Sequence, residues 1–282
     1  MLPAEEEIAP IRRDPAENNS FLTNSSLKSD GTCDKLNKKY IRSPGHEERQ
    51  TRPKTMKTSV YLASVRPLED EALYGQLRSL ASEERRKKAD RFRFAGGRRL
   101  SLGAEALLRV ALLEAGMSGT PLRYAYGKNG KPYLTDAPGF FFNLSHAGEY
   151  VMAAVSDAEI GCDIEMIRPV HPRLPRHVLT AEEAERFASA DEAERDALFT
   201  RYLTLKESYM KALGEGLARN PASFCIELGP PIRVLCGGTA EDYGFVDWDD
   251  LPGYRYAVCR AGTGWDAEKK NVCLEEAIQV LS

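Results

Sequence analysis

The sequence of 282 residues lacks the signals that mark several classes of protein. No apolar run approaches the roughly 20 residues that a membrane-spanning helix needs, so we expect no membrane segment. The six cysteines are scattered without a Cys-x-x-Cys pair, which argues against a zinc site and against a small disulfide-stabilised scaffold. A formal net charge of -3 gives no reason to expect nucleic acid as a partner. The start of the chain does not follow the charged-then-apolar order of a secretory signal, so a reducing cytoplasm is the expected location.

Residues 1–56 differ in composition from the rest of the chain. They mix charges of both signs with Asn, Ser, Thr and Pro, and they show no sustained hydrophobic period. Such a segment cannot bury enough apolar surface to offset the entropy that is lost when it is ordered. We expect it to be a disordered or dispensable extension, with Met56 as a candidate start of the folded protein.

The remaining chain shows helical and strand patterns in an order that occurs twice. The first half predicts a strand at 58–65, a helix capped by Ser82, a long helix over 98–117 and short strands around a polar turn. The second half predicts a strand at 160–165, a helix with a capping box, a long helix over 196–217 and four short strands. This order predicts an α+β fold, a pseudo-twofold pair of similar lobes, each with helices packed on a small antiparallel sheet. We place the N-terminal lobe at 57–158 and the C-terminal lobe at 159–282.

Two acids lie in the strand pattern IGCDIE. Because side chains alternate along a strand, Asp163 and Glu165 point to one face, while Cys162 and Ile164 point to the other face and are expected core residues. Neighbouring carboxylates repel unless a positive charge neutralises them, and magnesium suits this role because it prefers oxygen ligands. The alternative is an exposed strand face with both acids solvated, and the D-x-E triplet alone does not exclude it.

The helix pattern YLTLKESYMKAL places a carboxylate and an amine together. Glu207 and Lys211 are four residues apart and share one helical face, whereas Lys206 lies about 100° around the helix from Glu207. One interpretation is a site that needs an acid and a base on the same face. The alternative is a surface ion pair, which contributes about 0.3 kcal/mol and is common.

The polar turn FNLSHAGEY and a basic run are candidate ligand-binding features. Asn143, Ser145 and His146 lie between apolar strands, and Gly148 permits close approach of a phosphate. No acid at a suitable spacing completes a Ser-His-Asp triad, and the G-x-S-x-G elbow is absent. The basic residues before the turn are Arg85, Arg86, Lys87, Lys88, Arg91, Arg93, Arg98, Arg99, Lys128 and Lys131. They form either a solvated face or a site for a polyanionic small molecule.

In chain order, these motifs resemble those of the 4'-phosphopantetheinyl transferases, specifically the monomeric two-lobed Sfp type. The order is a basic helix, GKP, FNLSH, GCDIE, LTAEEAERF and KESYMK. The family pattern is approximately G-x-D-[IV]-E and then, about forty residues later, W-x-x-K-E-[AS]-x-x-K. Here the second part reads LTLKESYMK, with Leu203 in place of the usual Trp, and Cys162 replaces the Ile or Val of the first part. Both replacements are apolar and lie beside the acids.

The resemblance implies an activity and a set of site residues. The family transfers the 4'-phosphopantetheine arm of coenzyme A to a serine of an apo carrier protein and releases adenosine 3',5'-bisphosphate. It implies that Mg2+, or Mn2+, is held by Asp163, Glu165 and Glu207. Glu207 would also take the serine proton, and Lys211 would stabilise or protonate the leaving phosphate. The residues expected to bind coenzyme A are Arg85, Lys88, Arg99, Lys131, Ser145, His146, Lys206 and Lys211. Ser145 and His146 match the pair on the 3'-phosphate side, and Lys131 matches the lysine beside the adenine pocket.

The resemblance also implies partners. We expect apo acyl or peptidyl carrier proteins of fatty acid, polyketide or nonribosomal peptide synthases, in secondary metabolite biosynthesis, and a monomeric enzyme. Residues 167–180 contain three arginines and are either a surface for an acidic carrier helix or a connecting loop. Two rival functions use the same residues. They are a magnesium-dependent phosphohydrolase, which would consume coenzyme A without a carrier, and a non-catalytic module that binds coenzyme A or a carrier.

Overall fold

The protein was analysed as a computed structural model that describes residues 57–282, so the predicted extension at 1–56 lies outside the described residues. The helices are α1 (Glu71–Leu80), α2 (Glu83–Asp90), α3 (Ala95–Glu114), α4 (Pro175–Val178), α5 (Ala181–Ser189), α6 (Glu192–Leu213) and α7 (Leu274–Leu281). The strands are β1 (Thr58–Ser64), β2 (Tyr124–Tyr126), β3 (Pro132–Leu134), β4 (Phe141–Ala147), β5 (Tyr150–Ser156), β6 (Ile160–Met166), β7 (Cys225–Glu227), β8 (Arg233–Cys236), β9 (Thr239–Ala240), β10 (Tyr243–Trp248), β11 (Tyr254–Ala261) and β12 (Ala267–Asn271). This mixture of helices and small, mainly antiparallel sheets confirms the α+β class.

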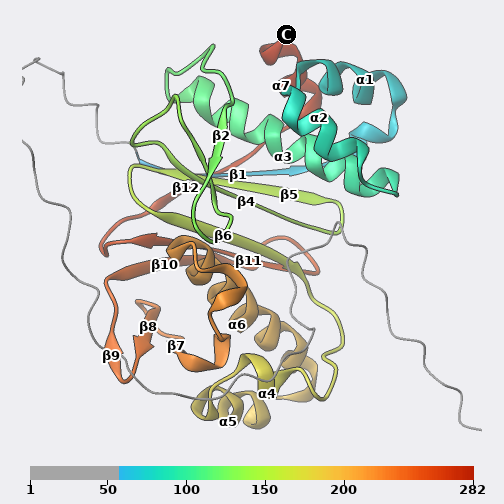
Figure 1. The fold of residues 1–282 in the computed structure, drawn as a ribbon. Helices are drawn as coiled ribbons and strands as arrows, with labels where there is room; N and C mark the ends of the chain where they lie inside the picture. The colour runs from blue at the N-terminus through green and yellow to red at the C-terminus, as the bar shows by residue number, and fades with distance from the viewer. Residues whose placement is uncertain (1–56) are drawn as a thin grey trace, which may run out of the picture. The chain divides into compact units, whose positions relative to one another are not determined.

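The elements stack in layers, with helices outside and two sheets inside (Figure 1). One sheet has the strand order β12-β1-β5-β4 and is covered by α3, while the other has the order β10-β11-β6 and is covered by α6. The two sheets share one strand order. In the first sheet β5 lies between β1 and β4, and in the second β11 lies between β6 and β10. In each repeat, the last strand therefore lies between the first strand and the last but one. Short helices, a long helix and a hairpin separate these strands in both halves, so the element order repeats as predicted, and the strand order repeats as well.

The helix starts follow the predicted capping chemistry. The Ser82 hydroxyl accepts a hydrogen bond from the backbone amide of Arg85 at 3.1 Å and begins α2. Thr180 and Glu183 form the expected reciprocal capping box at the start of α5. Side-chain caps of this kind satisfy amides that have no partner inside the helix. Across residues 57–282, every helix is too short or too polar to span a bilayer.

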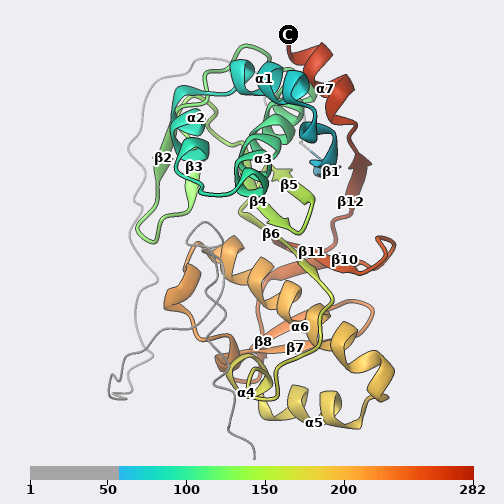
Figure 2. The same cartoon turned by 90° about the vertical axis from the view of Figure 1, so that its right-hand side faces the viewer.

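The C-terminal segment returns to the first sheet. Strand β12 runs parallel to β1, with Thr58 opposite Ala267, and α7 packs against α1 and α3 (Figure 2). Leu274 and Ile278 of α7 are buried in the core beneath α3. The predicted C-terminal lobe at 159–282 therefore includes a segment that packs with the N-terminal lobe. The parallel pairing also departs from the expectation of purely antiparallel sheets.

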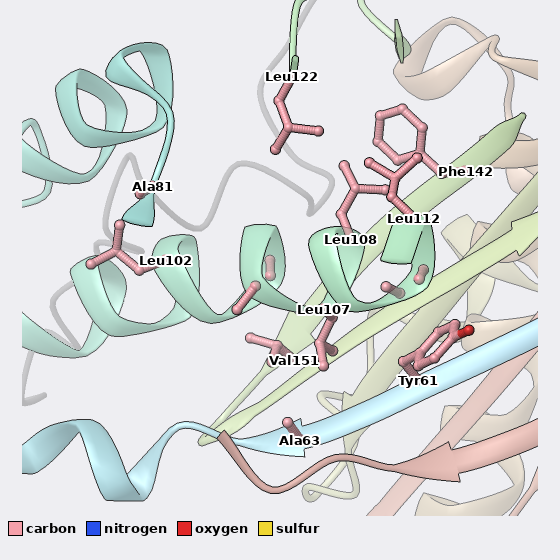
Figure 3. Close-up of a cluster of buried hydrophobic side chains, with 14 of the residues drawn as sticks. Tyr61, Ala63, Ala81, Leu102, Leu107, Leu108, Leu112, Leu122, Phe142 and Val151 are labelled. Atoms are coloured by element: carbon pink, nitrogen blue, oxygen red, sulfur yellow. The ribbon is translucent and has the colours of Figure 1, made fainter. Parts of the chain in front are cut away.

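Two clusters of apolar side chains form the core. The first surrounds α3, where Leu107 points toward Val151 of β5 and Tyr61 of β1, and Leu108 points to the other side, toward Phe142 and Leu122 (Figure 3). The second lies between the two sheets. Its residues include Val60, Leu62 and Met152 from the first sheet and Cys162, Ile164 and Tyr256 from the second. Cys162 and Ile164 are core residues, as predicted, so Asp163 points to the opposite face of β6, toward α6.

Gly161 lets the backbone of α6 touch β6. A Cβ atom at this position would collide with the carbonyl oxygen of Ser208 and the amide nitrogen of Ala212. Because these are backbone atoms, the only relief is a movement of the helix away from the strand. The absent side chain therefore brings Lys211 within reach of Asp163.

We predict that Gly161→Ala lowers the free energy of unfolding by about 1–3 kcal/mol, the range for overpacking a filled site. The rate of transfer should also fall, even under conditions in which the variant is fully folded, because α6 would shift relative to Asp163. Urea denaturation and a transfer assay measure the two effects. Gly75→Ala is the matched control, since Gly75 is an exposed helical glycine with nothing within 4 Å of its Cβ position. That change should stabilise by about 0.5–1 kcal/mol, and equal effects at both sites would contradict the prediction.

Candidate active site

Strands β4 and β6 are neighbours at the edges of the two sheets, and side chains join them. Asn143 Oδ1 accepts a hydrogen bond from the backbone amide of Cys162 at 2.9 Å. The Ser145 hydroxyl accepts one from the amide of Ile164 at 3.4 Å. A buried backbone amide needs a partner, and here β4 side chains supply it in place of a strand ladder. Asn143 therefore has a structural role at this junction. Together with Ser145, it fixes the position of β6, the strand that contains Asp163 and Glu165.

The reactive groups gather where α6 crosses this junction. Lys211 Nζ lies 2.6 Å from Asp163 Oδ1 and 3.1 Å from Ser145 Oγ. The Ser145 hydroxyl donates to the same Asp163 oxygen at 2.9 Å. Glu207 lies one turn earlier on α6 and is 8% exposed. Asp163 is only 3% exposed, so the alternative of a solvated strand face is wrong for this acid. The alternative of a surface ion pair on α6 is wrong too, because Lys211 forms a buried ion pair with Asp163.

Burial and neighbouring charges shift the pKa values of this group. Burial, and then the negative charge of Asp163, raise the pKa of Glu207 to about 7, although Lys211 opposes the shift. Burial alone would lower the pKa of Lys211, but Asp163 and Glu207 raise it above its ordinary value. The pair thus offers a carboxyl group that can exchange a proton near neutral pH beside a stable positive charge.

One oxygen of Asp163 is suited to bind a cation. Asp163 Oδ2 is buried and has no hydrogen-bond partner in the described part of the chain. An unpaired buried carboxylate oxygen is costly, and a hard divalent cation would satisfy it while offsetting the repulsion from Glu207. Glu165 is half-buried on the same face of β6. Among residues 57–282, no three His, Cys, Asp or Glu side chains are already arranged as a metal site. The donor chemistry therefore fits magnesium, while the three-carboxylate set is not preassembled.

His146 lies on the other face of β4 from Ser145. The two residues are adjacent, so their side chains point to opposite faces of the strand. Burial, and then the charges of Lys211, Lys88 and Arg85, lower the pKa of His146 to about 4. The histidine is therefore neutral at pH 7. Its pKa thus responds to charges from both α2 and α6.

Lys206 is not a coenzyme contact, and its prediction as one is wrong. Its side chain is completely buried. The ammonium group donates to Glu183 at 2.8 Å and to the carbonyl oxygens of Pro221 and Phe224 at 2.9 and 2.6 Å. These three bonds use all three ammonium protons. Lys206 instead ties α6 to α5 and to the segment before β7.

Two expectations about the FNLSHAGEY segment are also wrong. Asn143, Ser145 and His146 lie within β4, and the turn consists of Gly148 and Glu149. Ser145 donates its proton to Asp163 and accepts two hydrogen bonds, so it positions Asp163 and Lys211, and its contact with coenzyme A stays a prediction. A Cβ atom at Gly148 would meet the hydroxyl of Tyr254, so protein fills the space that was expected to admit a phosphate.

Lys131 and Arg99 form ion pairs with acids outside the predicted metal set. Lys131 Nζ donates to the carbonyl oxygen of Ala212 at 2.8 Å and pairs with Glu159 at 2.6 Å, which caps the end of α6. It also lines a cavity of about 420 Å³ with Tyr133, Phe140 and Leu213. Arg99 of α3 pairs with Glu69 at 2.9 Å. Arg99 therefore pairs with Glu69 and not with the acids near Lys211.

Sequence reasoning missed Glu105 altogether. This acid lies in the middle of α3, is 1% exposed and binds Ser82, Arg85, Arg109 and Tyr124. Its signal was available in the sequence, because an acid within the apolar run GAEALL must be paired if the helix is buried.

The comparison with known proteins agrees with this arrangement. Two family models match the chain: "4'-phosphopantetheinyl transferase, N-terminal" over residues 66–158 and "4'-phosphopantetheinyl transferase superfamily" over residues 159–259. The 4'-phosphopantetheinyl transferase psf-1 of Bacillus pumilus is 33% identical over 175 residues, which cover 60% of this chain and 74% of that protein. The 4'-phosphopantetheinyl transferase ffp of Bacillus subtilis is 30% identical over 199 residues, which cover 70% of this chain and 88% of that protein. The 4'-phosphopantetheinyl transferase Sfp of Bacillus subtilis strain 168 is 27% identical over 203 residues, with coverages of 71% and 91%.

The matched regions contain the junction of β4 and β6, the buried acids and the basic helix α2. The relatives are transferases, and they match along both lobes rather than over one motif. The chain therefore belongs to the 4'-phosphopantetheinyl transferase superfamily and is an enzyme of its Sfp type.

Proposed function

We propose that this enzyme transfers the 4'-phosphopantetheine arm of coenzyme A to a serine of an apo acyl or peptidyl carrier protein and releases adenosine 3',5'-bisphosphate. The observation that supports this most directly is the buried group of Asp163, Lys211 and Glu207 at the junction of the lobes. Relatives named 4'-phosphopantetheinyl transferases support the reaction class.

The side chains suit the individual events of the reaction. The carrier serine oxygen forms a bond to the pantetheine-side phosphorus of coenzyme A, and the bridging bond to the adenosine-side phosphate breaks. Glu207, whose pKa is raised to about 7, accepts the serine proton. Lys211 keeps its positive charge and stabilises the negative charge that develops on the departing phosphate. Phosphoryl transfer depends largely on such positioning and charge neutralisation.

The acids would hold the divalent metal. Asp163, Glu165 and Glu207 supply carboxylate oxygens, and Asp163 Oδ2 is the buried oxygen that lacks a partner. Mg2+, or Mn2+, supplies charge neutralisation at the pyrophosphate when it is bound. Without it, Ser145 and Lys211 hold Asp163 in place through its other oxygen.

The basic residues would bind coenzyme A. Arg85 and Lys88, whose charges lower the pKa of His146, would bind its phosphate groups, with the neutral His146 as a hydrogen-bonding group. The cavity beside Lys131 has aromatic and apolar walls that suit the adenine ring. Arg99 would join the phosphate site only if its ion pair with Glu69 opened.

Several finer points complete the proposal. The carrier would approach the side of residues 167–180, where Arg168, Arg173 and Arg176 suit an acidic helix. We further propose a monomeric, cytoplasmic enzyme that acts on carriers of fatty acid, polyketide or nonribosomal peptide synthases. Residues 1–56 would be dispensable for transfer, and the lobes would divide at residue 158.

Intact-protein mass spectrometry tests the proposal. Several apo carrier proteins are each mixed with the full chain, coenzyme A and magnesium. A gain of about 340 Da on a carrier, the mass of the transferred arm, is the expected result. Loss of that gain on chelation would support the metal requirement. Consumption of coenzyme A without any modified carrier would indicate a phosphohydrolase, and binding without consumption would indicate a non-catalytic module.

A further inference from the structure

Glu105 joins two helices of the N-terminal lobe through buried polar contacts. One carboxylate oxygen, Oε1, accepts from the backbone amide of Ser82 at 2.6 Å and from Arg109 at 3.2 Å. The other, Oε2, accepts from the hydroxyl of Ser82 at 2.8 Å, from Arg85 at 3.3 Å and from the hydroxyl of Tyr124 at 3.4 Å. A carboxylate that accepts this many bonds in the interior fixes the groups around it.

Helix α2 is held mainly by polar contacts, and those with Glu105 are the buried ones. Its sequence is EERRKKAD, and Ala89 is its buried residue. Apolar packing, which normally places a helix, is therefore nearly absent here. Glu105 fixes the first turn of α2, because it binds both Ser82 and Arg85. At the last turn, Asp90 pairs with Arg78 at 2.9 Å, but that pair is exposed.

Arg85 is confined by this arrangement. Its Nε atom faces Glu105, its guanidinium group lies 5.7 Å from the centre of the Tyr124 ring, and its side chain is 11% exposed. Its charge also contributes to the lowered pKa of His146. Since Nε is occupied, the terminal nitrogens are the donors that remain for a ligand.

We propose that Glu105 is a positioning residue for coenzyme A. It orients Arg85 through their buried contact and thereby sets the affinity for the 3'-phosphate without touching the coenzyme. This inference rests on the proposed function, because it takes the ligand to be coenzyme A. The physical reason is preorganisation. A guanidinium group that is already held in place loses little conformational entropy when the phosphate binds.

Calorimetric binding of coenzyme A and of dephospho-coenzyme A, which lacks the 3'-phosphate, tests this role in the full chain. Wild-type protein should prefer coenzyme A. In Glu105→Gln the affinity for coenzyme A should fall about tenfold, the scale of one hydrogen bond to a charged group, with little change for dephospho-coenzyme A. Arg85→Gln should lose the same preference. The double variant should lose no more than either single variant, because both act on one contact.

Glu114→Gln is the matched control. Glu114 lies on the same helix and binds Tyr61 and Lys270, so its replacement disturbs α3 without touching α2. The preference for coenzyme A should survive in this variant. If Glu105→Gln does not fold, Glu105→Asp keeps the charge but shortens the reach to Arg85, and it should show a partial loss.

Two results would overturn the inference. One is an unchanged preference in the folded Glu105 variants. The other is an equal loss of affinity for both ligands, which would mean a general structural role. A wild-type chain that binds coenzyme A with this preference but modifies no carrier would instead refute the proposed transfer, so the two failures are distinguishable.

Discussion

Glu207→Ala is expected to lower transfer by about 10³-fold or more, because it removes the group that accepts the serine proton together with a metal ligand. The fold should be retained. Glu207 is a buried carboxylate whose pKa is raised by burial and by Asp163, so its removal relieves repulsion and should leave the melting temperature unchanged or slightly higher. Carrier mass measured over time gives the rate, and thermal unfolding gives the stability.

The control for this variant is Glu194→Ala. Glu194 lies on the same helix but is exposed near its start, where its replacement should change neither quantity appreciably. Transfer at the wild-type rate by the Glu207 variant would refute the assigned role of this residue.

Lys211→Met is expected to have a large effect on both stability and activity. It leaves Asp163 buried without its cation, and breaking a buried ion pair by removing one partner costs about 3–5 kcal/mol. Transfer should be lost as well, because the positive charge at the departing phosphate is gone. Urea denaturation and the carrier assay separate the two losses.

A second change makes the test of Lys211 sharper. In the double variant Asp163→Asn, Lys211→Met the stranded charge is removed, so most of the stability should return while activity stays absent. Lys87→Met is the control for a surface pair, since Lys87 and its partner Glu83 are 68% and 72% exposed. Its effect should stay within about 0.5 kcal/mol. A stable, inactive Lys211→Met variant would show that the pair with Asp163 does not support the fold.

Much of the site could be predicted because two periodicities decide it. The two-residue period of a strand puts Asp163 and Glu165 on one face and the core residues on the other. The period of a helix puts Glu207 and Lys211 on one face. The partner of Lys211 could not be predicted in this way. It depends on how closely α6 approaches β6, and that distance is set by tertiary packing at Gly161.

Two features that the sequence did not reveal depend on long-range neighbours. Lys206 lies among apolar residues of α6, and its partners Pro221 and Phe224 come from a later segment that folds back over it. Strand β12 reads AEKKN, which has no apolar alternation to mark a strand. It is a strand because β1 offers it an edge.

The repeated strand order creates two equivalent strand positions, and only one of them holds the acids of the predicted metal site. In the first repeat, β1 takes the place that β6 takes in the second, and its sequence TSVYLAS contains no acid where β6 carries Asp163 and Glu165. The basic helix α2 belongs to the first repeat and the acids belong to the second. The first half therefore supplies the basic residues and the second half supplies the acids. The backbone is nearly symmetric, but the functional residues are not.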